Sequence, residues 1–175
     1  MSKMEYANPF VVDLAKKGTG RMKVEFINPF VKAAYDVLLA EVKSEIKKGE
    51  LSIQSSAFTA EEVTVMIGVA GPVQGVVLYG MSERTAKNIV SAMTGQTVPI
   101  FDRIVESAIA ELGNVITGRA SAELEKAGFS CRVTPPMVIV GRGAIISTVS
   151  IQRLVIPVEI VSGSIEICVA LRESG

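Results

Sequence analysis

The sequence predicts an α+β fold in which two long helices and one short helix cover a mostly antiparallel sheet. Segments with apolar residues at helical spacing alternate with segments rich in valine and isoleucine, which are typical of strands. The order of these segments repeats, because a long helix followed by three strands occurs twice, with the short helix between the two units. Short turns join consecutive strands, so neighbouring strands should run antiparallel.

The first unit is expected to begin with a long helix at Asn28, the residue before Pro29. Asparagine is a favoured N-cap, and proline is a favoured first helical residue. The helix should run to about Lys48 and end at Gly49, after two lysines that meet the negative end of the helix dipole. Three strands should follow, at residues 51–56, 63–70 and 73–81.

The short helix should begin after Ser82 as its cap, cover residues 83–94 and end at Gly95. Asp102 should open the second long helix, and Gly128 should close it. The strands of the second unit are expected at residues 130–140, 144–159 and 163–172. Prolines 135 and 136 should break the first of these strands, and Arg153 can interrupt the second.

The composition indicates a folded domain and excludes several kinds of site. Of the 175 residues, 49% are hydrophobic and 21% are charged, so the chain can bury a large core. The 18 basic residues balance the 18 acidic ones, which argues against a nucleic-acid-binding protein. The chain has no histidine, which excludes Ser-His and Cys-His nucleophile pairs. Cys131 and Cys168 fall in predicted strands and are interpreted as small core residues.

Nothing in the sequence predicts insertion into a membrane. Each apolar run is shorter than the roughly 18 residues that span a bilayer, and charged or polar residues interrupt any signal-peptide pattern. We therefore expect a cytoplasmic protein. Residues 1–21 are interpreted as an N-terminal extension of unknown role, and residues 22–175 as the folded domain. Residues 4–11 resemble residues 24–31, which leaves open a local duplication, an expression artefact or a start of translation at Met22.

The second long helix carries a line of polar and small residues. Ser107, Glu111, Asn114 and Gly118 are spaced 4, 3 and 4 residues apart, which aligns them along the helix axis. This line should border an apolar arc made of Ile104, Val105, Ala108, Ile109, Leu112, Val115 and Ile116. An ordinary solvated helix edge would also fit this spacing. However, asparagine is a poor helix-interior residue, and each glycine costs about 1 kcal/mol relative to alanine, so a helix that accepts three weak formers within six residues needs some reason for them.

At these residues the sequence resembles the CheC/CheX/FliY family of chemotaxis phosphatases. The family signature is Asp or Ser, three residues, Glu, two residues and Asn, followed by a proline, and Ser107, Glu111 and Asn114 match it. Pro135 and Pro136 stand 21 and 22 positions after Asn114, close to the family spacing. The resemblance covers about residues 22–172, the CheX-like phosphatase domain. The first long helix offers Glu41 but has Ser44 where Asn is required, and one intact pair per chain resembles the CheX branch.

The resemblance implies a protein phosphatase that hydrolyses the aspartyl phosphate of the response regulator CheY. Asn114 would position the attacking water, and Glu111 would anchor the receiver domain. Ser107 and Gly118 would line the docking edge. The chain would need no cofactor or metal of its own, because the phosphorylated receiver carries Mg²⁺. The branch also forms homodimers with a sheet continued across subunits, and we expect residues 163–172 to lie at the sheet edge where such a contact forms.

Two other classes of function remain open at this point. One is a non-catalytic module that binds a receiver, as in flagellar switch components. The other is a sensor that binds a small ligand between the sheet and the helices, although the sequence offers no convergent polar cluster for one.

Overall fold

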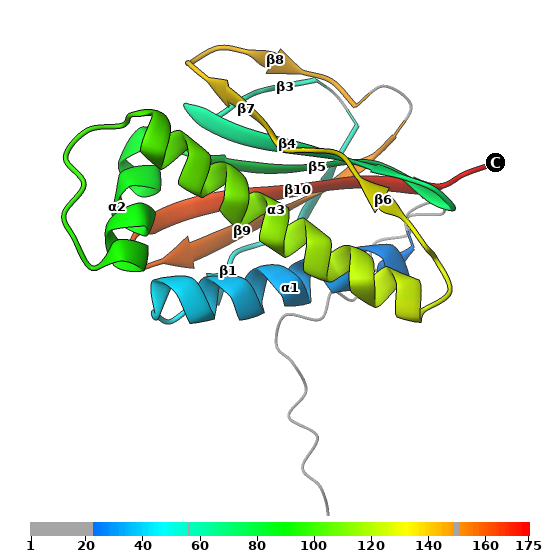
Figure 1. Cartoon of the computed structure of the whole chain (residues 1–175). Helices are drawn as coiled ribbons and strands as arrows, with labels where there is room; N and C mark the ends of the chain where they lie inside the picture. Colours follow the sequence, from blue (N-terminus) through cyan, green and yellow to red (C-terminus); the bar gives the residue numbers. More distant parts are fainter. Residues whose placement is uncertain (1–22, 56, 149–150) are drawn as a thin grey trace, which may run out of the picture.

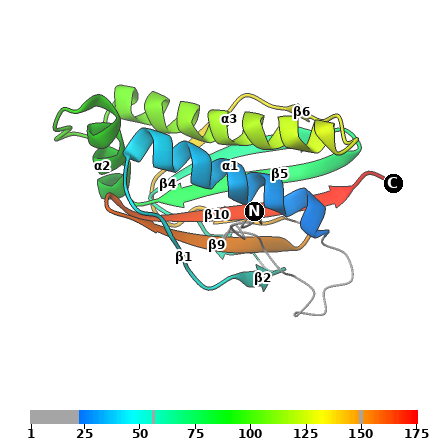
Figure 2. The same ribbon diagram turned by 90° about the horizontal axis from the view of Figure 1, so that it is seen from below.

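The two long helices lie side by side on one face of an antiparallel sheet in the computed structural model (Figure 1), which describes residues 23–55, 57–148 and 151–175. The view turned by 90° shows both helices on the same side of the central strands (Figure 2). This arrangement confirms the predicted fold class. The proposed N-terminal extension lies outside the described residues, so its boundary stays a prediction.

Two of the three helices have the expected bounds. Helix α2 (Glu83–Thr94) begins after Ser82, whose hydroxyl accepts a hydrogen bond from the Thr85 backbone N–H, and ends at Gly95 in the left-handed region. Helix α3 (Arg103–Lys126) begins after Asp102, whose carboxylate accepts hydrogen bonds from the backbone N–H groups of Ile104 and Val105. Each cap satisfies donors that have no partner inside the helix.

The sheet confirms that the chain is built from two similar units. The central hairpins β4–β5 and β9–β10 are joined through β5 and β10, and every recorded pairing is antiparallel. Strands β1 and β2 pair with β9, and β6 and β7 pair with β4, while β3 and β8 form a separate pair. The strands are β1 (Lys47–Lys48), β2 (Ser52–Gln54), β3 (Phe58–Thr59), β4 (Val63–Ala70), β5 (Val73–Met81), β6 (Arg132–Val133), β7 (Met137–Val140), β8 (Ile145–Ile146), β9 (Arg153–Ile160) and β10 (Gly163–Glu173).

Helix α1 (Val24–Val42) begins earlier than predicted. Pro29 therefore lies inside the helix and not at its first position. Phe26 and Ile27 are buried on the core side of this first turn. The Phe26 ring packs edge-on against Phe129 from the far end of α3, with ring centroids 5.1 Å apart. Burial of these two residues therefore outweighs the hydrogen bond that proline cannot donate.

Helix α1 also ends earlier than the predicted Lys48. Lys43 adopts the left-handed conformation with a φ of 54°, and Ile46 then turns back into the core. Lys47 and Lys48 pair with β9, so this segment satisfies its backbone groups in the sheet and not in a helix. Gly49 is required for a different reason than predicted, because an added Cβ would lie 2.9 Å from the Pro157 side chain on β9.

One strand prediction is confirmed and another is corrected. The expected strand 144–159 is interrupted before Arg153: β8 pairs with β3, and β9 starts at Arg153, whose guanidinium donates to the Gln54 side chain at 2.6 Å. The C-terminal strand β10 does not lie at a sheet edge, because it pairs with β9 on one side and β5 on the other. Its aliphatic side chains face the helices, so burial of that face places it in the centre.

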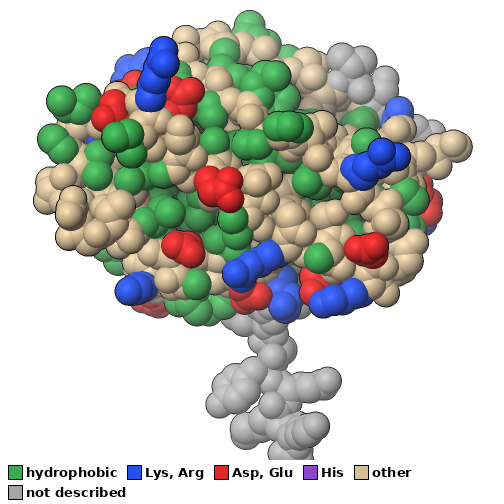
Figure 3. All heavy atoms as spheres, in the orientation of Figure 1, with side chains coloured by type: hydrophobic (Ala, Val, Ile, Leu, Met, Phe, Trp, Pro, Cys, Tyr) green, Lys and Arg blue, Asp and Glu red, His purple; other side chains and the backbone are tan. Residues whose placement is uncertain are grey.

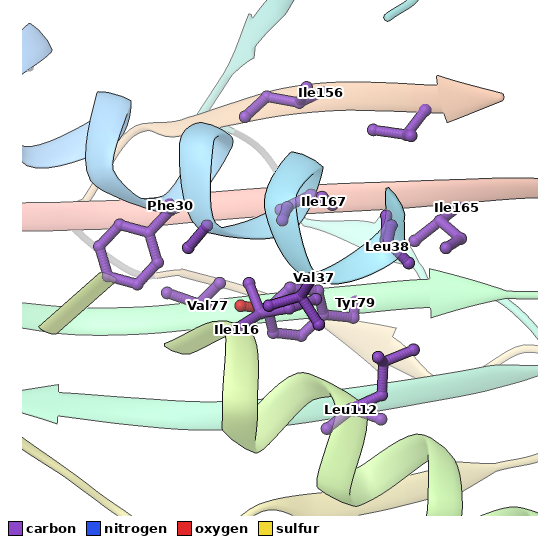
Figure 4. Packing of buried hydrophobic residues seen from close by; sticks show 14 of the residues in the cluster. Phe30, Val37, Leu38, Val77, Tyr79, Leu112, Ile116, Ile156, Ile165 and Ile167 are labelled. Atoms are coloured by element: carbon purple, nitrogen blue, oxygen red, sulfur yellow. The ribbon is translucent and has the colours of Figure 1, made fainter. Parts of the chain in front are cut away.

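The main core lies between the helices and the sheet. Figure 4 shows Leu112 and Ile116 of α3 directed toward the same cluster as Val37 and Leu38 of α1, above the aliphatic residues of the strands. A smaller cluster, made of Leu78, Val155 and Cys168, lies on the opposite face of the sheet, where Ile146 of β8 packs against it. Among the described helices, none is long and apolar enough to cross a membrane.

Candidate active site

The predicted line of residues occupies the outer face of α3, the helix that crosses the front of the molecule in Figure 1. Ser107, Glu111 and Gly118 are exposed, and Asn114 is half-buried. The core residues of the same helix point toward the sheet; they include Val105, Ile109, Leu112, Ile116 and Ala120. The helix therefore separates two roles, because one side holds the fold and the other presents functional groups to an incoming surface.

Gly113 fixes the position of α3 above the sheet. An added Cβ at this glycine would lie 3.0 Å from Val65 Cγ1 and 3.2 Å from the Tyr79 ring, so the helix approaches β4 and β5 closely. The buried Tyr79 hydroxyl lies 2.8 Å from the Thr117 hydroxyl, and the Thr117 hydroxyl donates to the Gly113 carbonyl oxygen at 2.8 Å. Burial raises the pKa of Tyr79, so its hydroxyl stays neutral and hydrogen-bonded.

The carboxylate of Glu111 and the amide of Asn114 stand next to each other. The Asn114 amide nitrogen donates to Glu111 Oε2 at 3.5 Å, which is the long limit of a hydrogen bond. This weak contact holds the carboxylate and the amide side by side. It leaves most of their donors and acceptors available to a partner. An amide offers one acceptor oxygen and two donor hydrogens, and an ionised carboxylate is an acceptor only. The pair can therefore hold a water molecule and a cation at adjacent positions.

Gly118, unlike Gly113, has no packing reason within the described chain. A Cβ added to Gly118 would meet nothing within 4 Å. Ser107 and Gly118 stand at the two ends of the line, which extends about 16 Å for eleven residues of helix at 1.5 Å each. Their small side chains leave the larger groups of Glu111 and Asn114 as the most prominent polar features between them.

The predicted apolar arc of α3 is wrong at one residue. Ile104 is not buried with its neighbour Val105 but is 74% exposed. Asp102 caps the helix, so Ile104 lies in its first turn. Four residues before it, Ile100 is also 68% exposed. The helical wheel assigned Ile104 to the core because it is apolar, and the cap at Asp102 is the sequence signal that places it at the helix end.

Helix α1 carries the counterpart of this face, but not at the predicted Glu41 and Ser44. The helix ends at Val42, so Ser44 lies outside it. The buried residues of the two helices repeat at the same spacing: Phe30, Ala34, Val37, Leu38 and Val42 in α1, and Val105, Ile109, Leu112, Gly113 and Thr117 in α3. Asp36 and Leu39 lie on the less buried side of α1 and stand three residues apart, as Glu111 and Asn114 do on α3.

These two residues cannot repeat the chemistry of α3. The Asp36 carboxylate forms an ion pair with Lys32 of the same helix at 3.1 Å. Leu39 is exposed, but its side chain has no hydrogen-bonding group to hold a water molecule. The first unit therefore has the architecture of the second unit but lacks its polar pair.

The described residues contain no group of three or more Cys, Asp or Glu side chains that could hold a metal ion. Cys131 is half-buried and Cys168 is buried, and both are free thiols. Burial raises the pKa of the Cys168 thiol to about 12, so this thiol is unreactive at neutral pH.

Comparison with known proteins decides the family. The sequence model described as chemotaxis phosphatase CheX matches residues 63–159. The chain is also 32% identical over 122 residues to the CheY-P phosphatase CheX of Thermotoga maritima, an alignment that covers 69% of this chain and 79% of the relative. The chain belongs to the CheX family of chemotaxis phosphatases.

Solved structures of similar proteins agree with this CheX assignment. A CheC-like superfamily protein from Shewanella sp. PV-4 has a TM-score of 0.79 and 26% identity, with 86% of this chain and 99% of that chain covered. The CheX–CheY–BeF₃–Mg²⁺ complex of Borrelia burgdorferi gives a TM-score of 0.75 and 30% identity, with 85% of this chain and 98% of that chain covered. Glu111 and Asn114 lie within the region that the CheX family model matches.

The two helical glycines of this CheX-family chain provide a test of the packing argument. Gly118→Ala should raise the free energy of unfolding by up to about 1 kcal/mol, because alanine is the better helix former and the added methyl group enters open space. Gly113→Ala should lower it, because the same methyl group is forced against Val65 and Tyr79. Urea unfolding of both variants beside the parent measures the difference. A Gly113→Ala protein more stable than the parent would show that close packing does not require this glycine.

Proposed function

We propose that this chemotaxis phosphatase hydrolyses the aspartyl phosphate of a CheY-type receiver domain, with Asn114 and Glu111 as its catalytic residues. The observation that carries the proposal is the adjacent amide and carboxylate on the exposed face of α3, 3.5 Å apart. The names of two similar proteins support the substrate, since one is a CheY-P phosphatase and the other was crystallised with CheY. We place the reaction in the cytoplasm, as the sequence predicts.

Asn114 would position the attacking water. In this reaction the water oxygen forms a bond to phosphorus, and the bond from phosphorus to the aspartyl oxygen breaks with its electron pair on the carboxylate. Phosphoryl transfer passes through a loose transition state, so the water needs alignment more than it needs deprotonation. A neutral amide provides that alignment, since its oxygen accepts a hydrogen bond from the water.

Glu111 would anchor the receiver beside the reacting group. An exposed carboxylate can form an ion pair with the lysine that receivers carry next to their phosphorylation site. One turn of helix separates Glu111 from Asn114, so this ion pair would hold the amide at a fixed place relative to the phosphoryl group. Ser107 and Gly118 would lie at the rim of the contact, where their small size permits close approach.

The metal ion of the reaction would come with the substrate. Phosphoryl transfer requires neutralisation of the charge on the equatorial oxygens, which Mg²⁺ commonly provides. The complex of the similar Borrelia protein contains Mg²⁺ together with CheY and BeF₃. We therefore assign no cofactor of its own to this chain.

The two alternative functions have less support. A binding-only module would not need a water-positioning amide beside its anchor. A small-ligand sensor of the predicted kind would need a cavity of some hundreds of Å³ between the sheet and the helices. The two apolar cavities beneath α1 and α3 hold only about 10 Å³ each, which is room for one water molecule at most.

The homodimer implied by the resemblance remains part of the proposal, with a different contact. Strand β10 is paired with both β9 and β5 over residues 165–169, so it has no free edge there for a second subunit. Among the described strands, β7 pairs only with β4, and its Met137 and Val140 are 60% and 46% exposed. An edge strand with exposed apolar side chains favours pairing with another chain, so we place the subunit contact at β7.

Asn114→Ala should reduce receiver dephosphorylation by about 100- to 1000-fold, because loss of a positioning group typically costs this much. The measurement is release of inorganic phosphate from a phosphorylated CheY-type receiver at saturating enzyme. The matched control is Asn88→Ala, an asparagine on α2 whose amide donates to the Ser162 carbonyl oxygen at 3.1 Å. If Asn114→Ala releases phosphate at the rate of the parent, the assignment of Asn114 is wrong.

Glu111→Gln should weaken binding of the phosphorylated receiver and make the remaining affinity less dependent on salt, because the substitution removes one charge and keeps the size. Titration of the receiver at low and at high salt measures both effects. Glu123→Gln on the same helix is the control, since Glu123 pairs with Lys126 and not with the proposed partner. An unchanged salt dependence for Glu111→Gln would contradict the anchoring role.

Met137→Lys should shift the protein from dimer to monomer, because it places a charge on the proposed edge contact. Light scattering at micromolar concentration gives the mass of the parent and of the variant. A parent that is monomeric throughout this range would refute the dimer. A variant that remains dimeric would move the contact away from β7.

A further inference from the structure

The start of α3 carries an apolar surface that the proposed catalytic pair does not use. Ile100 and Ile104, 68% and 74% exposed, stand on the walls of a cleft of about 320 Å³ between the end of α2 and the start of α3. Val90, Val98, Pro99 and Val105 form most of its apolar lining. Figure 3 shows hydrophobic side chains at the upper left of this face, where α3 begins in Figure 1.

The cleft is held in shape by hydrogen bonds on both sides. The Val98 backbone N–H donates to the Ser91 hydroxyl at 2.9 Å, and the Lys87 ammonium group donates to the Pro99 carbonyl oxygen at 3.3 Å. On the other wall, the Asp102 carboxylate accepts from the Ile104 backbone N–H at 3.0 Å. These bonds tie the connecting segment to both helices, so the two isoleucines are presented on a preformed surface.

This surface continues the line of functional residues. Ile104 precedes Ser107 by three residues, so it extends the series of Ser107, Glu111 and Asn114 by one helical turn on the same side of α3. The seven residues from Ile104 to Glu111 correspond to about 10 Å along the helix axis. A stable protein contact covers about 800 Å² of each partner, which is a patch about 30 Å across. A patch of this size that is centred on Glu111 and Asn114 reaches Ile104.

We propose that Ile100 and Ile104 form an apolar docking patch for the receiver domain, beside the catalytic pair. The inference rests on the proposed function, and it adds that the receiver must present an apolar residue next to its phosphorylation site. Burial of exposed isoleucine side chains gives affinity that salt does not screen, whereas the contact at Glu111 is electrostatic. The patch thus sets affinity and partner choice, and Asn114 sets the rate of the chemical step.

Ile104→Ser tests this division. Truncation of this apolar contact should raise the KM for a phosphorylated CheY-type receiver by about tenfold and leave kcat unchanged. The effect should persist at high salt. The matched control is Ile145→Ser, an isoleucine of equal type that is 77% exposed on β8, where β8 packs on the sheet face away from the helices. Light scattering confirms that both variants keep the mass of the parent.

The outcomes separate the two proposals. If the parent turns over the receiver and Ile104→Ser has the KM of Ile145→Ser, the docking patch is wrong and the catalytic assignment stands. If the parent binds the receiver without turnover, the same two variants compared by affinity decide the patch alone. A parent that neither binds nor turns over any receiver overturns both proposals. A change of mass in Ile104→Ser alone would show that a second copy of this chain covers the patch.

Discussion

The close approach of α3 to the sheet at Gly113 is the constraint on which the candidate site depends. The rotation of a helix about its axis is set by the residues that pack against its neighbours. In α3 the backbone at Gly113 packs directly against the side chains of Val65 and Tyr79, which fixes that rotation. The Tyr79–Thr117 hydrogen bond adds a directional contact at the next turn. With these residues facing inward, the 3.6-residue period leaves Glu111 and Asn114 no orientation except outward. A site of this kind is positioned by a core contact and needs no loop to hold it.

The internal duplication explains why only one helix carries the pair. Both units must bury the same face of a long helix against the same sheet, so the spacing of core residues is retained in α1 and α3. The outer faces contribute little to stability and are free to differ. On α1 that freedom allows an ordinary surface ion pair between Lys32 and Asp36 and an exposed Leu39. The shared packing therefore accounts for the repeated architecture, and it places no requirement on the polar residues of the outer face.

Local signals in the sequence were sufficient for α2, α3 and the central strands, because caps at Ser82 and Asp102 and apolar spacing act within a few residues. The line on α3 was predictable for the same reason, since helical periodicity aligns it whatever the helix packs against. The errors involve partners that are distant in sequence. Lys47 and Lys48 pair with β9, which is more than a hundred positions away in the sequence. Strand β10 lies in the centre of the sheet because it pairs with β9 on one side and β5 on the other. Asp102 marks Ile104 as a residue of the first turn of α3, but Val105 in the same turn is buried, so the exposure of Ile104 depends on what packs against that turn.

The balanced charge of the chain determines how a partner can be recognised in the proposed reaction. With 18 basic and 18 acidic residues, the protein has no net charge to attract a receiver from a distance. Recognition then depends on short-range contacts, which are one carboxylate, one amide and an apolar rim on a rigid helix. The carboxylate and the rim contact the receiver in the same way before and after hydrolysis. In the proposed reaction only the contact at Asn114 changes when the phosphoryl group leaves, so this contact distinguishes the phosphorylated receiver from the product.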